Sequence, residues 1–148
     1  MDKPVRVLIV DDHTLVRKGI RALLESKREA LVIGEAASAQ EAVEMARTLR
    51  PDVILMDLML RGDDGVSAIR EIRRESPDVR ILVLTSIGQE ERIFSAIKAG
   101  ALGYLLKDTS PQQLLDAIKA VRRGEPSLSP QVALKVIREI ESPAEWAR

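Results

Sequence analysis

The sequence has no cysteine and very few aromatic residues, and both shortages limit what the protein can be. Without cysteine among its 148 residues, it can form neither disulfide bonds nor metal sites built on thiolates. Aromatic residues make up 2% of the chain, so the core must be built from valine, isoleucine, leucine and alanine. The 23 basic residues balance the 23 acidic ones, so no excess charge of one sign indicates a protein that binds nucleic acid or membranes.

Long hydrophobic runs are also missing. No run approaches the roughly 18 apolar residues that a membrane span needs, and the N-terminus opens into a strand pattern without signal-peptide organisation. Hydrophobic residues still make up 45% of the chain, which is typical of a globular protein with a proper core. We therefore expect a cytoplasmic protein with no membrane partner, made of one domain and a modest extension.

The most informative stretch runs from Val53 to Asp57, four apolar residues followed by a carboxylate. A short apolar run bounded by turn residues is typical of a strand buried on both faces, as in a parallel sheet. Burying an unpaired charge is costly. Asp57 therefore either caps the following turn or belongs to a functional site at the carboxyl edge of the sheet.

Strand and helix patterns alternate along the whole chain. The predicted strands are residues 5–10, 31–34, 53–57, 80–85 and 102–106. An amphipathic helix pattern follows each strand, and capping signals such as Ser38-Ala39-Gln40-Glu41 mark helix starts. The alternation predicts an α/β fold: a flavodoxin-like, doubly wound, five-stranded parallel sheet in the order 2-1-3-4-5, with helices on both faces.

The pattern breaks at Gly124-Glu125-Pro126, which predicts a boundary. We expect a domain at residues 1–124 and a linker helix with a tail at residues 125–148. Ser129-Pro130 begins that helix, and Ser142-Pro143 ends it.

Polar side chains stand at the ends of four predicted strands. Asp11 and Asp12 follow the first strand, and Asp57 follows the third. Thr85 ends the fourth strand, and Lys107 follows the fifth. Because these four strands are consecutive neighbours in the predicted order, we expect the five side chains to converge at one edge of the sheet.

This set of groups suits phosphoryl transfer. Three neighbouring carboxylates repel one another, and Mg²⁺, which prefers oxygen ligands, relieves that repulsion. A metal, an ammonium group and a hydroxyl can stabilise a transferring phosphoryl group, which leaves one carboxylate, Asp57, as the nucleophile. Taken singly, the aspartates could be turn or cap residues, Lys107 a solvated charge and Thr85 an ordinary strand end. The occurrence of all of them at the ends of neighbouring strands favours a functional site.

Four phrases of the sequence resemble a known family. They are Leu8-Ile9-Val10-Asp11-Asp12-His13, Val53-Ile54-Leu55-Met56-Asp57, Leu84-Thr85-Ser86 and Gly103-Tyr104-Leu105-Leu106-Lys107-Asp108. The chain resembles the receiver domain of bacterial two-component response regulators over about residues 4 to 124. Within that family it is most similar to the NarL/FixJ subfamily, whose members usually carry a C-terminal LuxR-type helix-turn-helix.

The resemblance implies a role for each site residue. Asp57 would accept a phosphoryl group from a sensor histidine kinase or from a small donor such as acetyl phosphate. Asp12, Asp57 and the backbone carbonyl of Met59 would bind Mg²⁺ directly, and Asp11 would act mainly through a coordinated water. Lys107 would pair with Asp57 before the transfer and with the phosphoryl oxygens after it.

The resemblance also implies a switch. Thr85 would move towards the phosphoryl group, and Tyr104 would move with it, although Tyr104 could instead simply pack in the core. The protein would not be an enzyme in the usual sense, because it would catalyse only its own phosphorylation and dephosphorylation.

Three residues depart from familiar receivers. Asp108 stands where many receivers have proline, so we expect no cis peptide bond there. Met59 and Ile87, two residues after Asp57 and Thr85, are apolar and cannot orient the hydrolytic water. We therefore expect slow self-dephosphorylation.

No helix-turn-helix follows residue 141, and residues 127–141 resemble the linker helix that precedes such a domain. We expect a receiver cut from a transcription regulator, with a natural single-domain receiver as the alternative. DNA would then be contacted only through an output domain absent from this chain, and homodimerisation stays open.

Two other functions remain as alternatives. One is a Mg²⁺-dependent phosphohydrolase with an aspartyl-phosphate intermediate. Such enzymes carry an Asp-x-Asp pattern with the nucleophile after the first strand, whereas here Asp11 and Asp12 are adjacent and the better nucleophile follows the third strand. The other is an interaction module that never takes phosphate. Nucleotide binding has little support, because no glycine-rich phosphate loop follows any strand.

Overall fold

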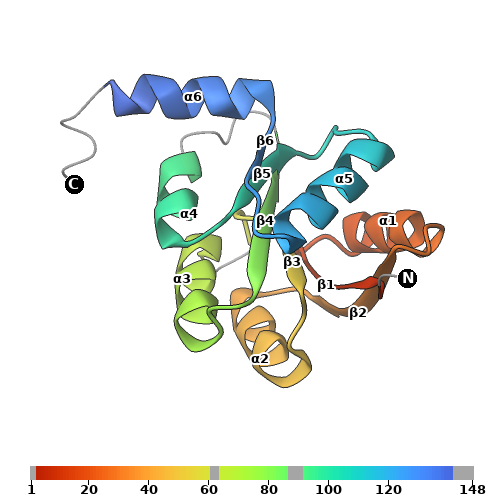
Figure 1. Ribbon diagram of the computed structural model, residues 1–148. Helices are drawn as coiled ribbons and strands as arrows, with labels where there is room; N and C mark the ends of the chain where they lie inside the picture. The colour runs from red at the N-terminus through yellow and green to blue at the C-terminus, as the bar shows by residue number, and fades with distance from the viewer. Residues whose placement is uncertain (1–2, 61–63, 87–91, 142–148) are drawn as a thin grey trace.

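The computed structural model describes residues 3–60, 64–86 and 92–141 (Figure 1). Three of the predictions fall outside these residues. They concern Ile87, the helix end at Ser142-Pro143 and the C-terminal tail.

The sheet has six parallel strands in the order β2-β1-β3-β4-β5-β6. The strands are β1 (Val5–Val10), β2 (Ala30–Ala36), β3 (Val53–Met56), β4 (Arg80–Thr85), β5 (Gly103–Leu106) and β6 (Ser127–Leu128). The predicted parallel α/β fold and the order of the first five strands are confirmed, but the prediction of five strands was wrong.

The sixth strand extends the sheet at its far edge. Ser127 pairs with Gly103 and Leu128 pairs with Tyr104. A strand of two residues is too short to show any alternation of polar and apolar side chains, so no sequence pattern marks it. It forms because the chain leaving α5 passes along the open edge of β5, whose backbone groups need partners.

Helices alternate with the strands. They are α1 (Thr14–Glu25), α2 (Ala39–Leu49), α3 (Gly65–Glu75), α4 (Ile93–Ala99), α5 (Pro111–Arg122) and α6 (Pro130–Ile140). The predicted cap at Ser38 is present, since its side chain accepts a hydrogen bond from the Glu41 N–H, and at α5 Ser110 forms a capping box with Gln113. None of the described helices combines the length and the hydrophobicity needed to cross a membrane.

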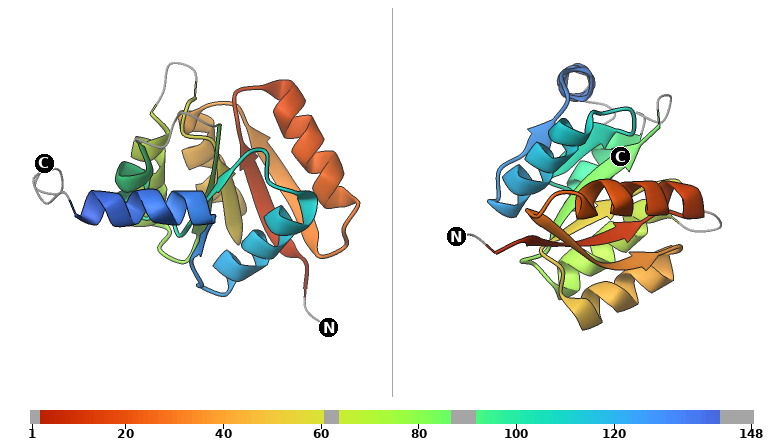
Figure 2. Two further views of the ribbon diagram at one scale, coloured as in Figure 1. Left: turned by 90° about the horizontal axis from the view of Figure 1, so that it is seen from above. Right: turned by 90° about the vertical axis from the view of Figure 1, so that its right-hand side faces the viewer.

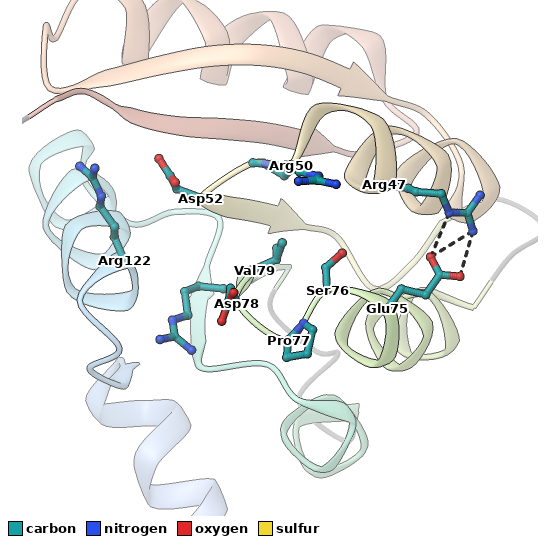
Figure 3. Close-up of a pocket in the computed structure, with 11 residues that line it drawn as sticks. Arg47, Arg50, Asp52, Glu75, Ser76, Pro77, Asp78, Val79 and Arg122 are labelled. Carbon is teal, nitrogen blue, oxygen red and sulfur yellow. Dashed lines mark hydrogen bonds and ion pairs between the residues drawn. The ribbon is translucent and has the colours of Figure 1, made fainter.

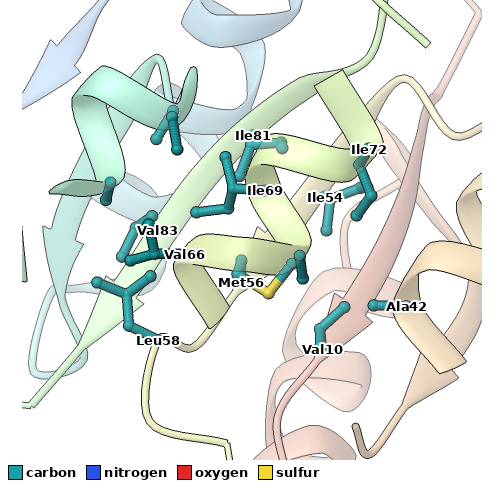
Figure 4. Close-up of a cluster of buried hydrophobic side chains, with 14 of the residues drawn as sticks. Val10, Ala42, Ile54, Met56, Leu58, Val66, Ile69, Ile72, Ile81 and Val83 are labelled. Carbon is teal, nitrogen blue, oxygen red and sulfur yellow. The ribbon is translucent and has the colours of Figure 1, made fainter. Parts of the chain in front are cut away.

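Two layers of helices cover the sheet, one on each face (Figure 2). On one face, α2, α3 and α4 pack on the sheet through a hydrophobic cluster (Figure 4). On the other face, α1 and α5 form a second cluster. All four residues of β3 are buried, as a central strand covered on both sides requires.

The last helix is joined to this core. Val132 of α6 is 1% exposed and belongs to the cluster beneath α2, α3 and α4. Leu134, Ile137 and Ile140 of the same helix are exposed. The boundary between a domain at residues 1–124 and a linker at residues 125–148 stays a prediction.

Candidate functional site

The carboxyl ends of β1, β3 and β5 bring three charged side chains together. Asp11 directly follows β1, Asp57 follows β3 and Lys107 follows β5. The ammonium nitrogen of Lys107 lies 2.8 Å from Oδ2 of Asp11 and 3.1 Å from Oδ2 of Asp57. These three residues therefore lie together, where the sequence predicted a site.

Backbone hydrogen bonds continue the sheet into this site. The Asp11 N–H donates to the carbonyl of Ala36, and the Asp57 N–H donates to the carbonyl of Val10. The Lys107 N–H donates to the carbonyl of Thr85 over 2.8 Å. The sheet thus fixes the backbone from which each charged side chain leaves.

The two carboxylates are buried, so their charge must be compensated. The side chains of Asp11 and Asp57 are 3% and 4% exposed, and that of Lys107 is 23% exposed. Burial acts to lower the pKa of Lys107, but the two carboxylates outweigh it and hold that pKa above its ordinary value. Lys107 is therefore the cation that allows two acids to lie together under the surface.

The pKa values of the two acids shift in opposite directions. Burial raises the pKa of Asp57, and the negative charge of Asp11 raises it further. Hydrogen bonds from Met59 and Lys107 act to lower this pKa but do not outweigh the rise. Burial acts on Asp11 as well, but hydrogen bonds from Lys107 and the His13 N–H outweigh it, so the pKa of Asp11 lies below its ordinary value. Asp57 is the more costly of the two carboxylates to keep ionised in this pocket.

A further acid and an imidazole complete the cluster. Nδ1 of His13 lies 3.1 Å from Oδ1 of Asp11 and 2.9 Å from Oδ1 of Asp12. One ligand atom from each of Asp11, Asp12, His13 and Asp57 lies within 4.8 Å of every other. Three carboxylates at this spacing are a hard oxygen donor set, which fits Mg²⁺.

The loop after β3 approaches the site closely. The Met59 N–H donates to Oδ1 of Asp57 over 3.1 Å, while Met59 itself is 45% exposed. Gly65, the first residue of α3, leaves no room for a side chain: a Cβ there would lie 2.8 Å from Cα of Leu58 and 3.0 Å from the carbonyl oxygen of Asp57. Asp64 caps α3 by accepting from the Val66 N–H.

The two predicted switch residues are fully buried. Thr85 ends β4 and has no exposed surface, and the Tyr104 ring on β5 lies in the cluster beneath α2, α3 and α4. Tyr104 therefore contributes to core packing in this structure. Every described peptide bond is trans, including the bond between Lys107 and Asp108, as expected.

Two residues near the acids were not predicted from the sequence to take part. His13 contacts both aspartates, and Arg17 donates to the carbonyl oxygen of Asp11 over 2.6 Å. His13 directly follows the acidic pair, a signal that could have been used. Arg17 lies in an ordinary helix pattern, and its contact depends on the packing of α1 against the sheet.

A separate cavity of about 700 Å³ lies at the opposite, amino end of β3 and β4 (Figure 3). Its lining mixes arginines with acids, and Arg47 is bound to Glu75 at 2.9 Å. None of the acids at the carboxyl edge lines it. The cavity is therefore not part of the site around Asp57.

Comparison with known proteins places this geometry in a family. Residues 7–119 match the family of response regulator receiver domains. The chain is 46% identical over 143 residues to the transcriptional regulatory protein LiaR of Bacillus subtilis, covering 97% of this chain and 68% of LiaR. It is 39% identical over 141 residues to the response regulator protein VraR of Staphylococcus aureus, covering 95% of this chain and 68% of VraR.

A solved structure extends the comparison to the fold. A two-component response regulator of the LuxR family from Aurantimonas sp. SI85-9A1 superposes with a TM-score of 0.85 at 38% identity, covering 92% of this chain and 97% of that one. The likeness therefore includes sequence and architecture over nearly the whole chain.

Proposed function

The chain belongs to the response regulator receiver family, which acts in two-component signalling, and from this premise we propose that Asp57 is its phospho-acceptor. The observation that carries the proposal is the contact between the buried Asp57 carboxylate and Lys107 at 3.1 Å, beside two further acids. Neither the phosphohydrolase nor the interaction module gains support from the relatives.

The transfer needs one nucleophile and a compensated charge. An Oδ atom of Asp57 attacks the phosphorus of a phosphohistidine on a sensor kinase; the new O–P bond forms as the P–N bond breaks, and the imidazole nitrogen keeps the bonding electron pair. Lys107 keeps Asp57 close to a positive charge before the attack and can follow the phosphoryl oxygens after it. The product is an acyl phosphate on Asp57.

The acidic cluster is suited to hold Mg²⁺ during this step. Asp12 and Asp57 would supply carboxylate oxygens directly, Asp11 would act mainly through a coordinated water, and the family resemblance adds the backbone carbonyl of Met59. The ion, when bound, neutralises negative charge that the phosphoryl group brings into the site.

Phosphorylation then changes the balance of charge at the edge of the sheet. It adds up to about two negative charges and three acceptor oxygens at one point. Thr85 and Lys107 are the donors on the neighbouring strands, and Tyr104 shares β5 with Lys107. Because Tyr104 pairs with Leu128 of β6, a shift of β5 can pass through β6 to α6.

The partners follow from the same reading. We place the chain in the cytoplasm, with a sensor histidine kinase as its phosphoryl donor and transcription regulation as its output, as the name of the relative LiaR suggests. The match covers 68% of LiaR, and any contact with DNA would be made through an output domain. Met59, whose N–H donates to Asp57, is an exposed apolar residue, which supports slow self-dephosphorylation.

Intact-mass spectrometry after treatment with acetyl phosphate and Mg²⁺ tests the proposal. We expect the wild-type chain and the surface variant Asp116→Asn to gain one phosphoryl group, and Asp57→Asn to gain none. Equal phosphorylation of Asp57→Asn would contradict the assignment. Turnover of a generic phosphate ester would instead favour a phosphohydrolase.

A further inference from the structure

We propose that Arg17 is a positioning residue for the acidic pair and that Glu35 holds Arg17 in place. The inference rests on the proposed function, because it concerns how the protein presents Asp11 and Asp12 to a metal ion and a phosphoryl donor. Neither Arg17 nor Glu35 contacts a reacting atom.

Arg17 joins the helix α1 to the turn that carries the acids. Its Nη1 donates to the carbonyl oxygen of Asp11 over 2.6 Å, and its Nε donates to Oε1 of Glu35 over 3.2 Å. Its Nη2 lies 3.3 Å from Oγ1 of Thr14. The side chain is only 13% exposed, so the planar guanidinium is held in one orientation by three partners.

The carbonyl of Asp11 controls the direction of both acids. It belongs to the peptide unit that joins Asp11 to Asp12, and that unit is planar. Holding its oxygen therefore fixes the plane from which the two residues continue. A charge-assisted hydrogen bond is roughly twice as strong as a neutral one, so Arg17 is an effective restraint.

An irregularity in the sheet places Glu35 where Arg17 can use it. Val7 pairs with Val32, but Leu8 pairs with Gly34, which leaves Ile33 as an extra residue in β2. Such a bulge reverses which face of the sheet the following side chains point to.

The reversal is visible in the packing. Val32, before the bulge, belongs to the cluster beneath α1 and α5, whereas Ala36, after it, belongs to the cluster on the opposite face. Glu35 therefore points towards α1; in an unbroken strand it would point away from it. The bulge thus aims one carboxylate at the helix that carries Arg17.

Glu35 forms ion pairs with basic residues from two turns of α1. Arg21 lies 2.6 Å from it and Lys18 lies 3.2 Å from it, in addition to Arg17. The Glu35 side chain is 12% exposed. Arg21 has Glu35 and Glu25 as its ion-pair partners among the described residues. Arg21 is therefore a matched control: it shares the carboxylate but does not contact the acidic turn.

The test compares Arg17→Ala with Arg21→Ala in the full chain. Isothermal titration with MgCl₂ measures the dissociation constant for Mg²⁺, and intact-mass spectrometry measures the rate of phosphorylation by acetyl phosphate. Outer-sphere partners of metal ligands typically change affinity or activity by 10–100-fold, so we expect Arg17→Ala to weaken Mg²⁺ binding and slow phosphorylation about tenfold. For Arg21→Ala, we expect the Mg²⁺ dissociation constant and the phosphorylation rate to stay within about twofold of the wild-type values. Both variants lose one ion pair with Glu35, so the comparison isolates the contact with the acidic turn.

Two further variants separate positioning from packing. Arg17→Lys keeps the charge but not the planar fork, so it should recover only part of the loss. Glu35→Gln should act in the same direction as Arg17→Ala and less strongly. Equal effects of Arg17→Ala and Arg21→Ala on the Mg²⁺ constant would overturn the inference, because the network would then only hold α1 on the sheet.

A readout without metal or phosphate keeps the inference independent of the proposed function. Hydrogen exchange of the Asp12 and His13 amides reports opening of the acidic turn. We expect faster exchange there in Arg17→Ala than in Arg21→Ala, and unchanged exchange would refute the positioning role. A wild-type chain that binds no Mg²⁺ and takes no phosphoryl group would refute the proposed function, while the exchange result still decides the role of Arg17.

Discussion

Fifty positions separate Asp57 from Lys107 in the sequence, yet the ammonium nitrogen of Lys107 lies 3.1 Å from Oδ2 of Asp57. The contact exists because β3, β4 and β5 are consecutive parallel neighbours, so their carboxyl ends meet at one edge. It ties the stability of the fold to the chemistry of the site, since the same cation balances two buried acids.

Replacing Lys107 with methionine should destabilise the protein when Mg²⁺ is absent. The change leaves Asp11 and Asp57 buried without their cation, and breaking a buried pair in this way costs about 3 kcal/mol. Saturating Mg²⁺ should recover much of the loss, because a bound cation stabilises the native state by mass action. Urea unfolding with and without MgCl₂ measures both effects.

The exposed pair between Lys119 and Glu29 offers the control for that experiment. Lys119→Met should change the unfolding free energy by less than about 1 kcal/mol, with or without Mg²⁺. A similar loss in both variants would mean that Lys107 has no special electrostatic role.

Asp57→Asn should not destabilise the protein in the absence of Mg²⁺, although it removes the proposed phospho-acceptor. The substitution keeps the shape of the side chain and removes one of three crowded carboxylates, so a gain of about 0.5–2 kcal/mol is expected. Added Mg²⁺ should raise the melting temperature of this variant less than that of the wild type. A clear loss of stability would show that the Asp57 charge is well compensated in the folded protein.

Gly65→Ala should displace the backbone that carries Asp57. The new methyl group would lie within 3.0 Å of the backbone of Leu58 and Asp57, which cannot move aside as a flexible side chain could. We expect a loss of about 1–3 kcal/mol on thermal unfolding, together with slower phosphorylation.

Gly19→Ala is the matched control, because a Cβ at Gly19 in α1 would meet no atom within 4 Å. Alanine there should stabilise the helix by up to about 1 kcal/mol and leave phosphorylation unchanged. Equal behaviour of the two alanine variants would contradict the close approach at Gly65.

The ion pairs of Glu35 should make the stability of the fold depend on pH, with a loss of stability at acid pH. Burial acts to raise its pKa, but hydrogen bonds from Arg21, Lys18 and Arg17 outweigh burial, so the pKa of folded Glu35 lies below its ordinary value. A depressed carboxyl pKa stabilises the fold above the unfolded pKa, and this stabilisation disappears as the pH falls through the folded pKa.

The free energy of unfolding should therefore differ most between the wild type and Glu35→Gln at neutral pH. The difference should shrink as the pH falls below about 4.3. Urea titrations at a series of pH values measure it. A difference that stays constant down to acid pH would mean that the ion pairs of Glu35 are not the source of its contribution.

Much of the fold and site could be predicted because each central strand carries a short apolar run that a polar residue follows. Val53 to Met56 are buried on both faces, so the position of Asp57 at the sheet edge follows from the strand alone. The same reasoning located Asp11 and Lys107. The convergence of these residues needed only the strand order, which the alternation of strands and helices restricts to few arrangements.

The remaining features depend on tertiary contacts that leave no local pattern. Ser127 and Leu128 become a strand only because β5 offers them an open edge. Glu35 faces α1 only because the extra residue Ile33 shifts the pairing with β1, and the ion pair between Glu35 and Arg17 depends on that shift. Neither the bulge nor the sixth strand changes the hydrophobic periodicity enough to be predicted.

Locating the phosphoryl group is the most direct test of the central proposal. Borohydride reduces an acyl phosphate on aspartate to homoserine, and peptide mapping then identifies the modified position. After treatment with acetyl phosphate and Mg²⁺, we predict homoserine at position 57 and at no other aspartate. Homoserine at position 11 or 12, or a phosphoryl group that resists reduction, would contradict the assignment of Asp57.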